Sequence, residues 1–196
     1  MPESREIALV PKVTVITGAG AGVGRTTVEE FARQGYDIGL LSRDPGRLEC
    51  AALKVRRHGG RALAIPTDVA NADDVEAAAS RIEAELGPID VWVNVAMATV
   101  FAPVSSLTAA EVERGTRVTY LGQVHGMMSA LKRMRVRNHG VIVNVGLSSI
   151  GRATATVNVP ATGLGDPRNR PTCSATLSLS SVSCGRSCSA IRGAHR

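Results

Sequence analysis

Short apolar runs and amphipathic segments alternate along the first three quarters of this chain of 196 residues. Apolar runs rich in valine and isoleucine predict buried strands, whereas apolar residues that recur at helical spacing predict helices. The predicted strands cover residues 13–16, 37–42, 61–66, 91–95 and 140–145, and the predicted helices cover residues 23–34, 45–58, 72–86 and 107–137. This alternation predicts an α/β fold, in which helices cover both faces of a doubly wound parallel sheet.

The last of these helices is the longest, and a break is expected in it near Gly115. The apolar residues that are expected to face the core recur at helical spacing: Leu121, Val124, Met128 and Leu131. In a parallel sheet of this kind a ligand binds at the carboxyl ends of the strands, beside the first strand.

A glycine-rich loop stands at that point, with glycines at Gly18, Gly20, Gly22 and Gly24. Without Cβ atoms the backbone can approach a ligand closely. The helix that follows offers free N–H groups and the positive end of its dipole, which together hold a pyrophosphate. The spacing is neither the Walker pattern nor a literal G-x-G-x-x-G, and a tight turn without a ligand would look the same. The surrounding strand–helix alternation favours the nucleotide site.

These residues resemble the short-chain dehydrogenase/reductases, Rossmann enzymes that move hydride between NAD(P) and a carbonyl or alcohol. Residues 17–24 are similar to the TGxxxGxG cofactor loop of that family. Asp68 and Val69 follow the third strand, where the family holds the adenine, and residues 94–97 stand where the family has Asn-Asn-Ala-Gly. Residues 140–145 resemble the strand that leads to the catalytic serine.

The resemblance covers roughly residues 12–151 and implies a Rossmann-type sheet, incomplete at its C-terminal side. It implies a small-molecule carbonyl or alcohol substrate, and it allows a homo-oligomer. The residues that it assigns to the cofactor are Gly18, Gly20, Gly22, Val23, Gly24, Asp68, Val69, Asn94 and Ala96.

The end of the second strand bears on the choice between NAD and NADP. An NAD site places an acidic residue there to accept hydrogen bonds from the ribose 2′-hydroxyl. This chain has Ser42 and Arg43 instead, and the first carboxylate is Asp44. A hydroxyl and a guanidinium suit a 2′-phosphate, so the sequence favours NADP over NAD. The alternative is that Arg43 is an ordinary solvated arginine in a loop. Arg25 and Arg47 either contribute to binding the phosphate or are surface charges.

The catalytic residues of the family are only partly present. The family uses a serine that binds the substrate oxygen and a Tyr-x-x-x-Lys pair, whose lysine lowers the pKa of the tyrosine for proton transfer. Ser148 or Ser149 takes the position of the serine, and Gly151 favours Ser148. No tyrosine or lysine follows in the sequence, because the last tyrosine is Tyr120 and the last lysine is Lys132.

Two further residues of the long helix bear on the same chemistry. Thr119 stands where the family has an active-site asparagine. Tyr120, one of only two tyrosines, is interpreted as a packed helix residue rather than as a substitute acid.

Composition changes after residue 151. Residues 152–196 hold six arginines, one acidic residue and three of the four cysteines, with no lysine and no aromatic residue. Such a segment has few large side chains to bury, so it offsets the entropy of ordering poorly. We therefore expect a Rossmann domain over residues 1–151 and an irregular, poorly ordered tail over 152–196. A reading-frame shift or a truncated gene after about residue 147 would explain the change.

The remaining features narrow the class of protein. The sequence pI is near 9.7, but the excess charge belongs to the tail, so no nucleic-acid partner is expected. The cysteines lack zinc-site spacing, so no metal is expected. Neither a signal peptide nor a membrane span is predicted, and a cytoplasmic location is expected.

Two functions remain open. One is an NADP-dependent oxidoreductase of unidentified substrate. The other is a dinucleotide-binding remnant without catalysis, because the proton-transfer pair is missing.

Overall fold

A computed structural model describes residues 12–100, 102–147 and 153–158 of the chain. The strands are β1 (Val13–Thr17), β2 (Asp37–Ser42), β3 (Ala62–Pro66), β4 (Ile89–Asn94), β5 (Val141–Leu147) and β6 (Ala153–Asn158). The helices are α1 (Gly22–Arg33), α2 (Pro45–Arg57), α3 (Ala72–Leu86), α4 (Ala109–Thr116) and α5 (Gly122–Arg137). A 3-10 turn, η1 (Val104–Ser106), precedes α4, and a π-helical turn, η2 (Arg117–Leu121), joins α4 to α5.

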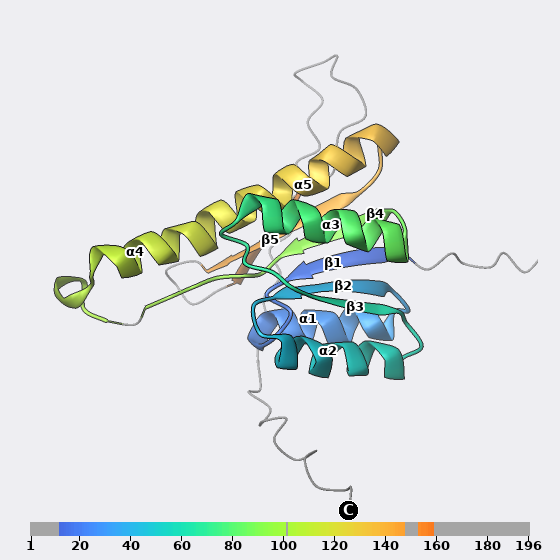
Figure 1. The fold of residues 1–196 in the computed structure, drawn as a ribbon, viewed down its shortest axis with the longest axis horizontal. Coiled ribbons are helices and arrows are strands. Elements are labelled where there is room, and N and C mark those ends of the chain that lie inside the picture. The colour runs from blue at the N-terminus through green and yellow to red at the C-terminus, as the bar shows by residue number, and fades with distance from the viewer. Residues whose placement is uncertain (1–11, 101, 148–152, 159–196) are drawn as a thin grey trace, which may run out of the picture.

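The strands form one sheet in the order β3-β2-β1-β4-β5-β6. The first five are parallel, and α1 and α2 cover one face while α3 and α5 cover the other, as Figure 1 shows. The direction of the crossovers reverses between β1 and β4, which opens a crevice at the carboxyl ends of these strands. The predicted doubly wound α/β fold is confirmed.

Helix ends follow from local sequence. Asp44 caps α2 by accepting a hydrogen bond from the N–H of Arg47 at 3.0 Å, and Pro45 occupies the first turn. Thr108 and Glu111 form a reciprocal capping box at the start of α4.

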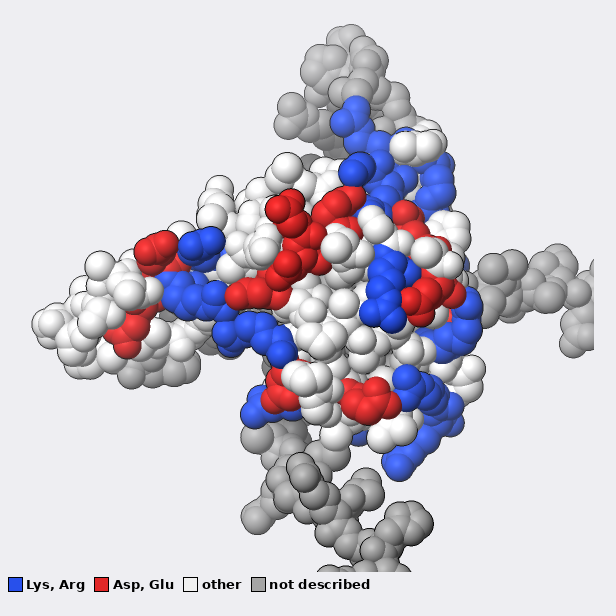
Figure 2. Space-filling model, in the orientation of Figure 1, with Lys and Arg blue, Asp and Glu red and all other residues white. Residues whose placement is uncertain are grey.

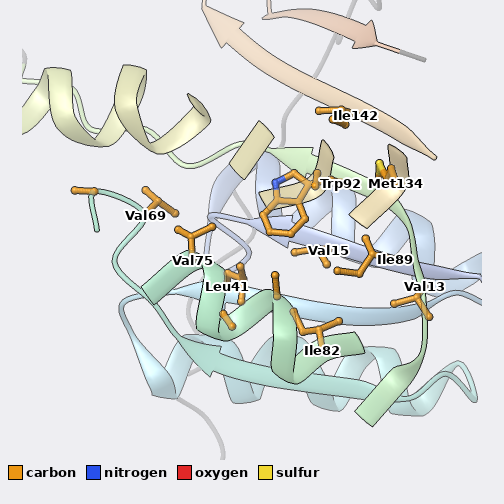
Figure 3. Close-up of a cluster of buried hydrophobic side chains, with 14 of the residues drawn as sticks. Val13, Val15, Leu41, Val69, Val75, Ile82, Ile89, Trp92, Met134 and Ile142 are labelled. Carbon is orange, nitrogen blue, oxygen red and sulfur yellow. The ribbon is translucent and has the colours of Figure 1, made fainter. Parts of the chain in front are cut away.

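Two apolar cores lie on opposite faces of the sheet. The core beneath α3 and α5 contains Val15, Ile82 and Trp92, and Figure 3 shows these side chains converging from strands and helix. The core beneath α1 and α2 contains Ile38 and Leu48. Successive strand residues alternate between the two cores, which is why each strand is apolar along its length.

The predicted core face of α5 is wrong. Met128 is 64% exposed, and Leu121 and Leu131 are also exposed. The residues that α5 buries are instead mostly small: Gly122, Gly126, Ser129, Ala130 and Met134. The helix needs small residues because a Cβ on Gly126 would lie 2.2 Å from Oδ1 of Asn94. The predicted break near Gly115 is also displaced, since the irregular turn spans Arg117–Leu121.

The expectation that the chain is irregular from Arg152 onward is wrong for residues 153–158. Those residues form β6, which pairs antiparallel with β5, for example Val143 with Val157. The segment Ala-Thr-Ala-Thr-Val-Asn is rich in β-branched residues, and β5 would otherwise present an unpaired edge. The remainder of the predicted tail lies outside the described residues.

Candidate dinucleotide site

A cavity of about 420 Å³ opens at the carboxyl ends of β1, β2 and β4. Its wall includes every residue that the sequence assigned to the cofactor except Asn94: Gly18, Gly20, Gly22, Val23, Gly24, Ser42, Arg43, Asp68, Val69 and Ala96. The strand order arranges this wall into a β2 side, a glycine loop after β1, and a side formed by the segment after β4.

The glycine loop requires the absence of side chains at specific positions. Gly18 has φ +70°, and a Cβ there would lie 2.9 Å from the backbone of Ala96. A Cβ on Gly24 would lie 2.1 Å from the carbonyl oxygen of Gly18. The loop therefore folds tightly onto the first turn of α1, whose N-terminus points to the cavity and favours an anion.

Thr17 ties this loop to the segment after β4. Its buried hydroxyl oxygen accepts hydrogen bonds from the N–H groups of Val95 at 3.0 Å and Ala96 at 3.2 Å. Sequence analysis placed Thr17 in the cofactor motif without assigning this role, which is visible only when β1 and β4 are adjacent.

Asn94 lies away from the cavity wall. It is 1% exposed, and its Oδ1 accepts a hydrogen bond from the indole N–H of Trp92 at 2.8 Å. Its Nδ2 donates to Oδ1 of Asn144 at 2.9 Å and to the carbonyl of Gln123. Asn94 thus links β4, β5 and α5 through a buried cluster of hydrogen bonds that stabilises the fold.

The β2 side of the cavity holds the two residues predicted for a 2′-phosphate. Ser42 and Arg43 both line the wall, together with Arg47 from α2. The hydroxyl oxygen of Ser42 is buried and has no hydrogen-bond partner in the described structure. A Cβ on Gly20 would lie 3.0 Å from that oxygen, so Gly20 leaves it room.

Arg25 lies outside the cavity wall but stabilises the part of the site next to Ser42. Its guanidinium donates to the carbonyl oxygens of Gly20 at 3.0 Å and Arg47 at 2.7 Å. It therefore ties the glycine loop to α2, a role that neither of the two interpretations from sequence included.

Asp68 and Val69 follow β3 and line the cavity. Partial burial acts to raise the pKa of Asp68, but hydrogen bonds from the N–H of Ala70 and from Arg114, with the nearby Arg43, hold it below its ordinary value. Asp68 is thus an anion whose position is fixed by α4 through Arg114.

Four apolar residues complete the wall on the β4 side, and the sequence did not assign them to the site. They are Val95 and Met97 from the segment after β4, Val118 from the π-helical turn, and Val145 from β5. Val95, Met97 and Val145 each end or follow a predicted strand, which is the signal that could have found them. Val118 comes from a helix and had no such signal.

The candidate catalytic residue Ser148 lies outside the described residues. The interpretation of Tyr120 as a packed helix residue is wrong, because Tyr120 is 66% exposed, and it lines a separate shallow groove with Thr99 and Val112. Among the described residues no helix combines the length and apolar character that crossing a membrane requires.

The fold and this crevice define a nucleotide-binding protein of the Rossmann type. A family model described as short chain dehydrogenase matches residues 12–160, and the chain belongs to the short-chain dehydrogenase/reductase family of oxidoreductases.

Individual relatives agree with this assignment. The chain is 34% identical over 140 residues to 2,3-dihydro-2,3-dihydroxybenzoate dehydrogenase of Bacillus subtilis, an alignment covering 71% of this chain and 54% of that protein. It matches the structure of an NAD+-bound xylitol dehydrogenase with TM-score 0.65 and 30% identity, covering 68% of this chain and 52% of that one. It matches an alcohol dehydrogenase from Thermococcus sibiricus in complex with 5-hydroxy-NADP with TM-score 0.63 and 28% identity, covering 68% and 57%. The chain spans about half the length of the curated relatives that it matches.

Proposed function

We propose that this chain binds NADP(H) in the cavity beside the glycine loop and prefers it to NAD(H). One observation carries the preference: Ser42, whose buried hydroxyl has no partner in the described structure, lines the same wall as Arg43 and Arg47. A buried polar group without a partner is costly, and a phosphate oxygen would relieve that cost.

The charges around this hydroxyl support a phosphate rather than a free ribose hydroxyl. Asp44 is the only carboxylate on this side of the described wall, and it is already engaged. It accepts a hydrogen bond from the N–H of Arg47 at 3.0 Å and pairs with the Nε of Arg47 at 3.2 Å. Arg43 lines the cavity beside Ser42, which brings its positive charge to the same wall.

The rest of the cavity fits the remainder of the dinucleotide. The glycine loop and the N-terminus of α1 suit the pyrophosphate, and Asp68 with Val69 suits the adenine. The apolar wall on the β4 side leaves space for the nicotinamide, the ring that supplies hydride when the cofactor is bound. We propose hydride transfer involving a small carbonyl or alcohol as the activity of the full family site, of which this chain holds the dinucleotide-binding half.

Titration of the purified chain with NADPH and NADH tests the preference. We expect tighter binding of NADPH, and we expect Arg43→Ala to reduce the difference because a charged phosphate contact is worth about 1.5–3 kcal/mol. Arg57→Ala is the matched control, since Arg57 is an exposed arginine at the other end of α2. Equal affinity for both dinucleotides in the folded wild-type chain would contradict the NADP assignment.

A further inference from the structure

The segment after β4 forms one wall of the cavity but belongs to no helix or strand. Residues 95–98 run from the end of β4 toward η1, and Val95, Ala96 and Met97 line the cavity. A segment of this kind has no ladder of backbone hydrogen bonds, so side chains must hold it in place. Thr17 holds its beginning, through the N–H groups of Val95 and Ala96.

Thr119 holds its far end. The hydroxyl of Thr119 accepts a hydrogen bond from the N–H of Ala98 at 3.0 Å and donates one to the carbonyl oxygen of Ala98 at 3.1 Å. One side chain therefore satisfies both backbone groups of a single residue, which fixes the position of Ala98 relative to the helix.

The π-helical turn η2 brings this threonine and a wall residue into one structural unit. Val118, its neighbour, is buried and lines the cavity, while Thr119 contacts Ala98. A π-helical turn is rare and is often found at functional sites. The turn thus contributes one wall residue directly and fixes a second part of the wall through Thr119.

We infer that Thr119 is a positioning residue, which sets the affinity for the nicotinamide half of the dinucleotide by fixing the segment after β4. The inference rests on the proposed function. In the proposed binding mode the 2′-phosphate lies at Ser42, the pyrophosphate at the glycine loop and the nicotinamide beside Met97 and Val145, which line successive parts of the cavity along the order β2-β1-β4-β5. Loosening Ala98 therefore disturbs only the nicotinamide end.

The experiment compares two ligands that differ in that end. NADPH fills the whole cavity, whereas adenosine 2′,5′-bisphosphate reaches only the β2 side and the glycine loop. Thr119→Val removes the hydroxyl at nearly constant volume, and Thr119→Ser retains it. Thr116→Val is the matched control, because the Thr116 hydroxyl bonds only within its own helix, to the carbonyl of Val112 at 2.9 Å.

We expect Thr119→Val to weaken NADPH binding about tenfold, as the loss of two hydrogen bonds would do, and to leave the affinity for adenosine 2′,5′-bisphosphate within about twofold. Thr119→Ser and Thr116→Val should bind both ligands like the wild type. Unchanged NADPH affinity in Thr119→Val, or equal losses for the two ligands, would overturn the inference. Failure of the wild-type chain to bind either ligand would overturn the proposed function and the inference with it.

A measurement on the wild-type chain covers the case in which Thr119→Val does not fold. Amide hydrogen exchange at Ala98 reports on the contact with Thr119 directly. We expect NADPH to slow this exchange and adenosine 2′,5′-bisphosphate to leave it unchanged. The same exchange rate with both ligands bound would overturn the inference.

Discussion

At Gly24 the first turn of α1 packs directly against the backbone of the cofactor loop. A Cβ at this position would lie 2.1 Å from the carbonyl oxygen of Gly18, whereas a Cβ at Gly22 would meet nothing within 4 Å. Gly22 has φ +53°, so alanine there is strained only by its backbone conformation. We expect Gly22→Ala to lower the free energy of unfolding by about 1–2 kcal/mol and Gly24→Ala to lower it by about 3 kcal/mol or more.

Urea unfolding followed by circular dichroism measures the free energy of unfolding of both variants. NADPH titration measures how each change affects binding at the cofactor loop. Gly24→Ala should lose NADPH binding, because the loop has to move away from α1 to accommodate the methyl group. Gly39→Ala controls for a clash at a buried glycine outside the loop, since its Cβ would lie 2.4 Å from Cδ1 of the buried Ile82, on the opposite side of the sheet from α1. Equal stability of Gly22→Ala and Gly24→Ala would contradict the geometry of the loop.

Residue type and position along the chain were enough to predict most of the cavity wall. Glycines after a strand, and Ser42 with Arg43 at the end of the next one, lie where the strand order requires. Asn94 shows the limit, because the motif marks its position but not the direction of its side chain. That side chain points to Trp92 and Asn144, and only the packed sheet reveals this.

At the scale of elements, α5 shows why periodicity alone chose the wrong face. Leu121, Met128 and Leu131 repeat at helical spacing, but the sheet beneath α5 already contains the large side chain of Trp92. The helix can approach it only with small residues such as Gly126. The sequence predicted the helical region over residues 107–137 but misplaced its break and its buried face, and the buried face depends on the volume of the partner.

Helices α3 and α5 are joined by a charged cluster centred on Glu76. Its carboxylate accepts hydrogen bonds from Arg133, Lys132 and the Ser129 hydroxyl. Figure 2 shows basic and acidic side chains interspersed on the face that these helices present. The bond from Arg133 is the main reason that the pKa of Glu76 falls to about 2, against an ordinary value of 4.5, even though partial burial acts in the opposite direction.

This shift makes the stability of the helix pair dependent on pH. Because the folded-state pKa of Glu76 is depressed, its contribution is complete above about pH 4.5 and is lost as the pH falls toward about 2. Glu76 is 35% exposed, so solvent screening reduces the contribution, and we expect Glu76→Gln to cost about 1–2 kcal/mol at neutral pH. Urea unfolding between pH 2 and pH 7 measures it.

Glu85→Gln is the control on the same helix, because Glu85 forms an exposed pair with Arg81. We expect that change to cost less than about 0.5 kcal/mol. The difference in stability between wild type and Glu76→Gln should shrink as the pH falls below about 4.5. A difference that stays constant down to pH 2 would show that Glu76 acts through packing rather than charge.

At the scale of the whole molecule, the alternation of strands and helices predicted the parallel sheet correctly but did not predict β6. Strands β1 to β5 follow the predicted order of segments, with small shifts at their ends. The composition of residues 152–196 favoured irregular chain, yet residues 153–158 pair with β5. Average composition over 45 residues hides a short β-branched segment, and the open edge of a sheet recruits such a segment.

Turnover of a substrate also depends on the whole molecule, because it needs a proton donor in addition to the dinucleotide cavity. Carbonyl reduction needs a proton donor of matched pKa as hydride arrives, and such general acid catalysis is worth about 10²–10⁴-fold. No tyrosine or lysine follows Ser148 in the sequence, and Tyr120 lines a groove separate from the cavity. A serine hydroxyl alone is too weak an acid near pH 7. We therefore expect NADPH binding without reduction of a broad panel of ketones and aldehydes above background.

Oxidation of NADPH, followed by its absorbance, is the measurement, with the unfolded chain as the blank. Insertion of a family-type segment containing Tyr-x-x-x-Lys after Ser149 should produce turnover, because the described residues already form the dinucleotide cavity. Robust turnover by the unmodified chain that Tyr120→Phe or Ser148→Ala abolishes would contradict the prediction. It would mean that the proton reaches the carbonyl from Tyr120, which lines the separate groove, or from Ser148 itself. Binding without turnover would instead separate the two halves of the family's chemistry, with cofactor capture residing in residues 12–147 and proton transfer requiring the Tyr-x-x-x-Lys pair.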